Sequence, residues 1–332
     1  MDLNTMDNTI KSVFLNYKDV LLHSAAKSGD HALIHFLLDQ CKANPNRMQS
    51  TTPLFEASRY GQAEVVEILI KYGADVNKES KTEVINHCRL LENEQHDEMS
   101  PCWMTPLHVA IIKKQLEIAK ILIENGANVN SDLGYDIGYT PLFSAVLDES
   151  FEIAKLLIQN GAKIHSKRQE VTLLEIACQG GHLDMVKLLV DNGANIHQPS
   201  KHGNTNLNTA AYYGHFEIVK FFIDSGANIC EKTENGLPIH GVIKGWRSHR
   251  EESYMKTLQI LTTPETVNSI YTIYRKRRTP LGLAAENGLI QVVKYLLEKG
   301  AIPDQSDLQA TRNKQVIELL KHDIEMRKLN PN

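Results

Sequence analysis

The sequence predicts an all-α fold: a solenoid of about eight helix–turn–helix repeats, with finger loops between the repeats and capping helices at both ends. Three observations support this prediction. One motif of about 33 residues recurs along most of the chain, each copy holds two short segments with helical periodicity, and in most copies a glycine follows the second segment. The clearest copy is TPLHVAIIKKQLEIAKILIENGANVN, at residues 105–130.

The residues of the motif explain each part of the repeat. The leading Thr can cap the first helix, and the Pro after it occupies the first helical position, where a missing N–H costs nothing. Ile118, Ile121 and Leu122 recur at i, i+3 and i+4, which predicts an amphipathic second helix. Glycines such as Gly161 follow that helix, where a left-handed residue is favoured.

The copies begin at residues 20, 52, 105, 140, 172, 205, 237 and 279, and the first and seventh are degenerate. This pattern resembles the ankyrin repeat over residues 20–304. The resemblance implies a concave surface, formed by fingers and first helices, that binds partner proteins. It also implies that His23, His108 and His240 tie adjacent fingers together, while His182 and His215 are structural residues of the turn between the two helices.

The ends of the array need covers, because each repeat depends on its neighbours to bury its faces. One apolar stripe, at Ile10, Val13, Phe14 and Tyr17, predicts an N-terminal capping helix within residues 1–19. A second stripe predicts a C-terminal capping helix and tail within residues 305–332; it consists of Val316, Ile317, Leu319, Leu320 and Ile324.

Composition and charge restrict the class of protein. The 36 Lys and Arg residues face 40 Asp and Glu residues, and this net charge of −4 disfavours a nucleic-acid-binding protein. No apolar run is long enough to span a membrane, and the first residues do not form a signal peptide. Five widely spaced cysteines without a CxxC pair favour a reducing compartment, so we expect a cytoplasmic protein. We also expect the protein to be monomeric.

An insertion at residues 78–104 interrupts the array between the second and third repeats. It holds His87, Cys88, His96 and Cys102, which are residue types that bind zinc or serve as a cysteine nucleophile and its base. Their spacing matches no known module, and no third group that would orient a base is evident. We therefore expect a solvated excursion with a short helix around residues 84–91, and we predict no catalytic residue, metal or cofactor.

A second insertion, at about residues 246–254, lengthens the turn within the seventh repeat. Trp246, beside Arg247, His249 and Arg250, either anchors a partner or fills the gap that an irregular repeat creates. The following finger carries Arg275–Lys276–Arg277–Arg278. A charged, solvated finger is the favoured interpretation, and a nuclear-import signal or a phosphate contact is the alternative.

Tyr, Arg and Lys residues are frequent at the positions that the resemblance assigns to the concave face. Tyr and Arg are over-represented where protein interfaces concentrate their binding energy. The candidate protein-binding residues are Arg59, Tyr60, Lys113, Tyr135, Tyr139, Arg168, His202, Tyr212, Tyr213, Trp246 and Arg275. The alternative for the tyrosines, and for Tyr60 and Tyr212 above all, is half-buried packing on neighbouring helices.

These observations predict a non-catalytic scaffold that binds a partner protein through its concave face. One alternative is an enzyme or regulator with a Cys/His site in the insertion at residues 78–104, and another is a nuclear adaptor that uses the RKRR finger. Long irregular arrays of this kind resemble eukaryotic proteins and also the secreted effectors of Legionella-like intracellular bacteria. The usage of Lys, Ile and Asn favours an effector, which would act on a host protein in the host cytosol.

Overall fold

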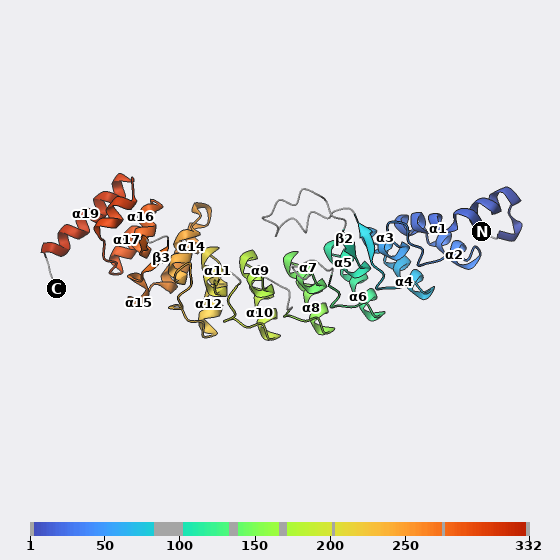
Figure 1. Ribbon diagram of the computed structural model, residues 1–332, viewed down its shortest axis with the longest axis horizontal. Coiled ribbons are helices and arrows are strands. Elements are labelled where there is room, and N and C mark those ends of the chain that lie inside the picture. The colour runs from blue at the N-terminus through green and yellow to red at the C-terminus, as the bar shows by residue number, and fades with distance from the viewer. Residues whose placement is uncertain are drawn as a thin grey trace. The chain divides into compact units, whose positions relative to one another are not determined.

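A computed structural model describes residues 3–82, 102–132, 139–165, 171–200, 203–273 and 276–329 (Figure 1). It confirms the all-α prediction: helix pairs follow one another along the chain, and strands occur only as short pairs in the described fingers. The chain divides into two compact units, residues 1–169 and residues 170–332.

In the described part of the first unit there are four helix pairs, preceded by a 3₁₀ turn, η1 (Leu3–Thr5). Within the unit, the first helices of successive pairs pack against one another, and so do the second helices. The pairs are α1 (Asn8–Ser28) with α2 (His31–Asp39), α3 (Pro53–Tyr60) with α4 (Ala63–Lys71), α5 (Pro106–Ile112) with α6 (Leu116–Glu124), and α7 (Pro141–Leu147) with α8 (Phe151–Gln159).

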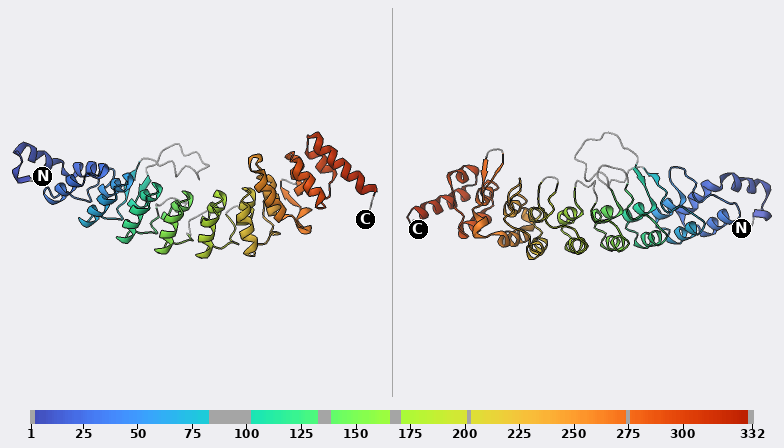
Figure 2. Two further views of the ribbon diagram at one scale, coloured as in Figure 1. Left: turned by 180° about the vertical axis from the view of Figure 1, so that it is seen from behind. Right: turned by 60° about the horizontal axis from the view of Figure 1, so that its bottom comes forward.

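In the described part of the second unit there are five helix pairs, and the first helices of successive pairs again pack against one another (Figure 2). They are α9 (Leu173–Gly180) with α10 (Leu183–Asp191), α11 (Asn206–Tyr212) with α12 (Phe216–Asp224), α13 (Pro238–Lys244) with α14 (Glu251–Leu261), α16 (Pro280–Glu286) with α17 (Ile290–Glu298), and α18 (Gln305–Ala310) with α19 (Lys314–Leu329). A 3₁₀ turn, η3 (Ser248–Arg250), precedes α14, and the short helix α15 (Pro264–Val267) follows it.

Two fingers contain antiparallel strand pairs. Strand β1 (Ser80–Thr82) pairs with β2 (Cys102–Met104), with Ser80 opposite Met104, so the two ends of the first insertion lie side by side. Strand β3 (Tyr271–Ile273) pairs with β4 (Lys276–Arg278) in the finger between the seventh and eighth repeats.

The helix caps confirm the roles predicted for Thr and Gly. The hydroxyl of Thr52 accepts a hydrogen bond from the backbone N–H of Phe55 at 3.2 Å, and the hydroxyl of Thr279 accepts one from Gly282 at 2.9 Å. After the second helices, Gly161 has a φ of 84°, a left-handed conformation that glycine adopts without strain. These local signals set where each helix begins and ends.

The hydrophobic core of each unit lies between its first and second helices. Phe55 and Leu69 are fully buried in the first unit, as Phe222 and Leu258 are in the second. The small residues of the first helices, such as Ala57, are buried as well, which allows neighbouring first helices to approach closely. The core thus extends from repeat to repeat within each unit.

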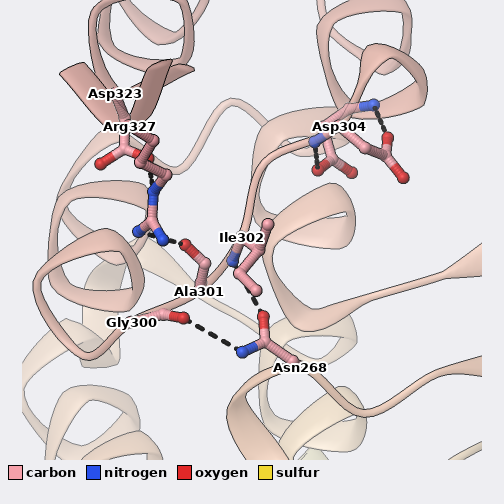
Figure 3. Close-up of polar contacts among 8 residues, drawn as sticks. Asn268, Gly300, Ala301, Ile302, Asp304, Asp323 and Arg327 are labelled. Atoms are coloured by element: carbon pink, nitrogen blue, oxygen red, sulfur yellow. Dashed lines mark hydrogen bonds and ion pairs between the residues drawn. The ribbon is translucent and has the colours of Figure 1, made fainter. Parts of the chain in front are cut away.

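A ladder of asparagine side chains links successive repeats at the base of the fingers. Asn46 donates to the carbonyl of Gly73 at 2.7 Å and accepts from the N–H of Asp75 at 2.7 Å. Asn77 makes the same pair of bonds to the next repeat at 3.1 and 2.7 Å. In the second unit, Asn268 bonds to the carbonyl of Gly300 at 3.0 Å and to the N–H of Ile302 at 2.8 Å (Figure 3).

The N-terminal helix differs from the prediction of a separate cap at residues 1–19. Helix α1 continues from Asn8 to Ser28 through the predicted boundary, because Val20 and Leu21 occupy the positions where other repeats have the capping Thr and Pro. Part of the apolar stripe also remains uncovered: Tyr17 is 57% exposed, whereas Phe14 packs edge-to-face on Phe36, with the ring centroids 5.2 Å apart.

The C-terminal segment forms two helices where one was predicted. Helix α18 packs against α16 and helix α19 packs against α17, which is the arrangement of a ninth repeat. Val316 and Leu320 of the predicted stripe are fully buried. Arg327 donates to the carbonyl of Ala301 at 3.0 Å and fastens α19 to the loop after α17 (Figure 3).

The lengthened turn of the seventh repeat is shorter than the predicted range of residues 246–254. Helix α14 begins at Glu251, so Tyr254 lies inside the helix and is buried. Glu251 and Glu252 occupy its first turn, where negative charge is favourable beside the exposed N–H groups of the backbone.

Candidate functional site

Most of the predicted binding residues that the structure describes lie at the C-terminal ends of first helices. Arg59 and Tyr60 end α3, and Lys113 caps α5. In the second unit, Tyr212 ends α11 and Tyr213 caps it, while Trp246 follows α13. The fingers precede the first helices, so these residues lie at the opposite end of each first helix from the fingers. Tyr135, Arg168, His202 and Arg275 lie outside the described residues.

In the first unit, cationic side chains gather around Tyr60, which is 43% exposed. The ammonium of Lys27, near the end of α1, lies 5.0 Å from the centroid of the Tyr60 ring. The guanidinium carbon of Arg59 lies 5.7 Å from the same centroid. Both distances fall within the range of cation–π attraction, so these contacts order the two cations around the ring. Lys113 is exposed at the end of α5, which packs against α3.

In the second unit, Tyr212 and Tyr213 form an exposed aromatic pair. Each is 37% exposed, and their rings meet edge-to-face with centroids 5.2 Å apart. The Tyr213 ring also stacks on His215, with an interplanar angle of 20° and a centroid distance of 6.1 Å. The pair presents two phenol groups next to the turn between α11 and α12.

His215 is held in one tautomer by the groups on either side of it. Its Nε2 lies 3.1 Å from the carbonyl oxygen of Gln179, which can only accept, so Nε2 carries the proton. Its Nδ1 then accepts from the guanidinium of Arg250 at 3.1 Å. Burial lowers the pKa of His215, as does the positive charge of Arg250, while the bond to Gln179 opposes the shift. The ring is therefore a neutral structural residue, as predicted for this turn.

The lengthened turn of the seventh repeat supports the tyrosine pair from behind. The hydroxyl of Tyr254 donates to the carbonyl of Tyr212 at 3.1 Å, and Ser253 donates to the carbonyl of Gly214 at 2.6 Å. Trp246 is half-buried and packs against Tyr254, with ring centroids 5.4 Å apart. Sequence reasoning did not predict these bonds from Ser253 and Tyr254, because they join residues about 40 positions apart in the chain.

Trp246 combines the two roles that the sequence left open. Its packing on Tyr254 fills space within an irregular repeat, as the structural interpretation requires. Part of its surface also lines an open hollow of about 580 Å³ that includes Leu289, Ile290 and Lys294. Aromatic side chains in surface hollows often anchor a binding partner. Trp246 therefore remains a candidate binding residue although it packs on Tyr254.

The prediction that Tyr139 is a binding residue exposed on a finger is wrong. Tyr139 is only 4% exposed, and its ring packs edge-to-face on Phe143 at a centroid distance of 4.9 Å. Phe143 occupies the slot where other repeats place a histidine, and an apolar ring there needs an apolar neighbour rather than a hydrogen-bond partner. The replacement of histidine by Phe143 was the sequence signal for the burial of Tyr139.

The basic finger before the eighth repeat has a mixed environment. Arg277 is exposed, as expected of a solvated finger. Arg278 instead forms an ion pair with Glu286 at 3.3 Å, and Tyr271 is nearly buried beside His240. The ammonium of Lys244 lies 4.3 Å above the Tyr271 ring. This finger is therefore fastened to the ends of α13 and α16.

The histidines in the first helices have the structural role predicted for them. His23 bridges the carbonyls of Asp19 and Thr51 at 2.8 and 2.9 Å, and His240 lies 3.3 Å from the carbonyl of Ser269. The bonds to Thr51 and Ser269 reach the next finger. The bond of His108, to the hydroxyl of Thr105 at 2.8 Å, instead stays within its own repeat. Burial lowers the pKa of His108 to about 4 and that of His240 to about 4, so both rings are neutral at pH 7.

The predicted alternatives in the first insertion fall mostly outside the described part of the chain. His87, Cys88 and His96 lie there, as does the expected short helix, and of Cys102 only the backbone is described. Among the described residues, no group of three or more His, Cys, Asp or Glu side chains is arranged to hold a metal ion. No described helix has the length and apolar character needed to cross a bilayer.

Stacked helix pairs, joined by fingers and tied by histidine and asparagine bonds, define a helical-repeat protein. The chain belongs to the ankyrin-repeat family: the pattern for three consecutive ankyrin repeats matches residues 4–80, 81–168 and 165–233, and the pattern for a single ankyrin repeat matches residues 276–308. Ankyrin repeats are in general protein–protein interaction modules.

Among solved structures, the chain is similar to the human ASB11 ankyrin repeat domain. The TM-score is 0.55 and the sequence identity is 23%, over 74% of this chain and 98% of that domain. This similarity confirms the fold. No curated protein matches the chain significantly.

Proposed function

We propose that this protein is a non-catalytic scaffold that binds a partner protein through the concave face of its repeats. The observation that carries the proposal is the exposure of Tyr60, Tyr212 and Tyr213, at 37–43%, at the ends of first helices whose other residues are largely buried. Tyrosine provides a large, amphipathic contact area at little cost in conformational entropy, and it is enriched in interface hot spots.

The order of these side chains before binding supports the same function. Tyr213 stacks on His215, and His215 is fixed by Gln179 and Arg250. A partner that meets side chains already held in place pays less to order them, so more of the contact energy appears as affinity. Aromatic side chains that are already held in place favour binding of a partner protein over catalysis.

The proposal includes a place of action: the protein acts as a monomeric secreted effector in the cytosol of a host cell and binds a host protein there. The buried thiols of Cys41 and Cys178 favour a reducing compartment, since such thiols are typical of intracellular proteins. The irregular repeats and the usage of Lys, Ile and Asn favour the same origin.

Affinity capture from a eukaryotic lysate tests the scaffold function. A variant with Arg59, Tyr60, Tyr212 and Tyr213 all changed to Ala should lose the proteins that the unmodified chain retains, because their anchors are gone. The matched control changes four exposed second-helix residues to Ala; they are Lys120, Lys155, Lys187 and Lys220. Both variants should keep a cooperative unfolding transition. Equal retention by the two variants would refute the concave-face proposal.

A further inference from the structure

We propose that the first unit binds an acidic, extended polypeptide segment along the ends of helices α1, α3 and α5. This inference rests on the proposed scaffold function and specifies the chemistry of one of its partners. The surface concerned, called here the basic row, consists of Lys27, Arg59, Tyr60, Lys113 and Lys114. All of these residues except the half-exposed Arg59 are exposed.

Within the described part of the first unit, the cations of the basic row form no ion pairs. Among the residues that the structure describes, no carboxylate oxygen lies within the 4.0 Å ion-pair limit of Lys27, Arg59 or Lys113. Two acidic residues at the start of second helices already have other contacts: Asp30 caps α2, and Glu64 contacts His31 at 3.1 Å. The positive charge of the row therefore remains available to a ligand.

The contacts around Tyr60 bring two like charges to one ring. Lys27 lies 5.0 Å and Arg59 lies 5.7 Å from its centroid. The ring attracts each cation, but the two cations repel each other. A carboxylate placed between them would relieve that repulsion and accept hydrogen bonds from both. The site thus holds two donors in place for one acidic group.

The spacing of the helices fits an extended chain. Packed helices lie 8–10 Å apart, and an extended polypeptide advances about 3.3 Å per residue. One helix end therefore corresponds to about three residues of a bound segment. Acidic side chains at every third position would meet the ends of α1, α3 and α5 in turn, so a segment of about nine residues covers the row.

The end of the row limits its length and disfavours a long polyanion. At the next helix, α7, the corresponding positions carry Asp148 and Glu149, so the sign of the charge reverses. The whole chain also has a net charge of −4. A nucleic acid that continued beyond the row would meet like charge, whereas a short acidic segment ends before it. We therefore favour a polypeptide over a nucleic acid.

The test uses the full chain and a labelled nine-residue peptide with Glu at every third position, separated by Gly and Ser. Fluorescence anisotropy measures its affinity, with a peptide that carries Gln in place of Glu as the probe of charge. We expect the Glu peptide to bind at least about tenfold more tightly than the Gln peptide, because several charge-assisted hydrogen bonds are lost together. We also expect its binding to weaken as salt is raised.

Two triple variants locate the site. Changing Lys27, Arg59 and Lys113 to Gln should weaken the Glu peptide about tenfold, which corresponds to about 1.4 kcal/mol shared among three exposed contacts. The control changes three exposed second-helix residues of the same unit to Gln, namely Lys71, Lys120 and Lys155, and should bind as the unmodified chain does. Circular dichroism and thermal unfolding verify that both variants fold.

Three results would overturn the inference: equal affinity of the two triple variants, equal affinity for the Glu and Gln peptides, or tighter binding of a single-stranded oligonucleotide through the same three residues. These results are distinguishable from failure of the scaffold function. If the Glu peptide does not bind more tightly than the Gln peptide but the quadruple Ala variant still loses its captured proteins, the scaffold function stands and only the proposal of an acidic partner segment is wrong. If capture is also unchanged, both proposals fail.

Discussion

The last asparagine of the repeat motif is a single residue that joins two repeats. Asn46, Asn77 and Asn130 each bond to a glycine carbonyl in the following repeat, at 2.7, 3.1 and 3.0 Å. His197 and Cys230 occupy the same motif position in the second unit, and both are exposed. The ladder of asparagine bonds is therefore interrupted where these residues replace asparagine.

Restoring the asparagine at His197 should stabilise the second unit. In His197→Asn, the amide would reach the carbonyl of Gly226 and the N–H of Asn228, which correspond to the partners of Asn46. Two new hydrogen bonds at an exposed site should raise the free energy of unfolding by about 1 kcal/mol. Urea denaturation measures the change.

Cys230→Asn is the matched control for that substitution. The repeat after Cys230 replaces the usual glycine turn with Thr262, Thr263 and the helix α15, so the partner carbonyl of the ladder is not in the same place. We expect no comparable gain there. Equal stabilisation by both substitutions would show that the effect comes from asparagine itself and not from the ladder.

At the scale of helices, the two ends of the chain show how far periodicity can predict structure. Both predicted stripes form helices, because the spacing of apolar residues is a local property. The N-terminal stripe remains largely exposed, with Val13 at 49% and Ile10 at 52%, whereas Leu320 is fully buried. A pattern identifies which face of a helix is apolar, but only contacts with distant segments decide whether anything covers that face.

Truncation of one residue in each stripe should reproduce this difference. Leu320→Ala removes a fully buried side chain and should lower the free energy of unfolding by about 2–5 kcal/mol. Val13→Ala changes a half-exposed side chain and should cost less than about 0.5 kcal/mol. Chemical denaturation of both variants gives the comparison. Similar losses would mean that the N-terminal stripe is covered in solution.

Tyr139 and helix α1 show which features of the fold can be predicted from neighbouring residues and which depend on distant contacts. The Thr caps and the left-handed glycines follow from residues close together in the motif, so the sequence predicts them. The histidine bonds to the next finger span about 28 residues, and they were expected only from the resemblance to ankyrin repeats. The continuation of α1 past Asp19 was also readable, since the capping Thr and Pro are absent there. The burial of Tyr139 depends on Phe143 in the following helix, and the bonds from Tyr254 and Arg250 to the sixth repeat depend on a fold already formed.

At the scale of the whole molecule, buried titratable groups differ between the two units. His108 lies in the first unit, where burial lowers its pKa to about 4. His240 lies in the second unit and has its pKa lowered in the same way to about 4. The second unit also contains Asp307, whose pKa is raised to about 6 by burial and by the charge of Asp304, against hydrogen bonds that lower it.

These groups act on stability in opposite directions as the pH falls. An unfolded imidazole titrates near pH 6.5, so the unfolded chain takes up protons at pH 4–6.5 before the buried rings do, and stability is lost over that range. Asp307 behaves in the opposite way. Its carboxyl takes up a proton from about pH 6 downward in the folded state but only near pH 3.9 in the unfolded state, so the free energy of unfolding rises as the pH falls from 6 to 3.9.

We therefore expect acid to destabilise both units, because burial lowers the pKa of His108 in the first unit and of His215 and His240 in the second. From their shifts, His108 and His240 each contribute a loss on the order of 2 kcal/mol between pH 7 and pH 5, and Asp307 offsets about 1 kcal/mol of the loss in the second unit. The chain has two tryptophans, Trp103 and Trp246, one in each unit. Trp246→Phe leaves Trp103 as the fluorescent reporter of the first unit, and Trp103→Phe leaves Trp246 as the reporter of the second. The unfolding of each unit in urea can then be followed at pH 7 and pH 5.

Asp307→Asn tests the offset itself. Its amide cannot take up a proton over this range, so the variant should increase the acid loss of the second unit by about 1 kcal/mol, while the Trp103 signal of the first unit stays unchanged. An unchanged pH dependence of the Trp246 signal would exclude Asp307 as the source of the offset.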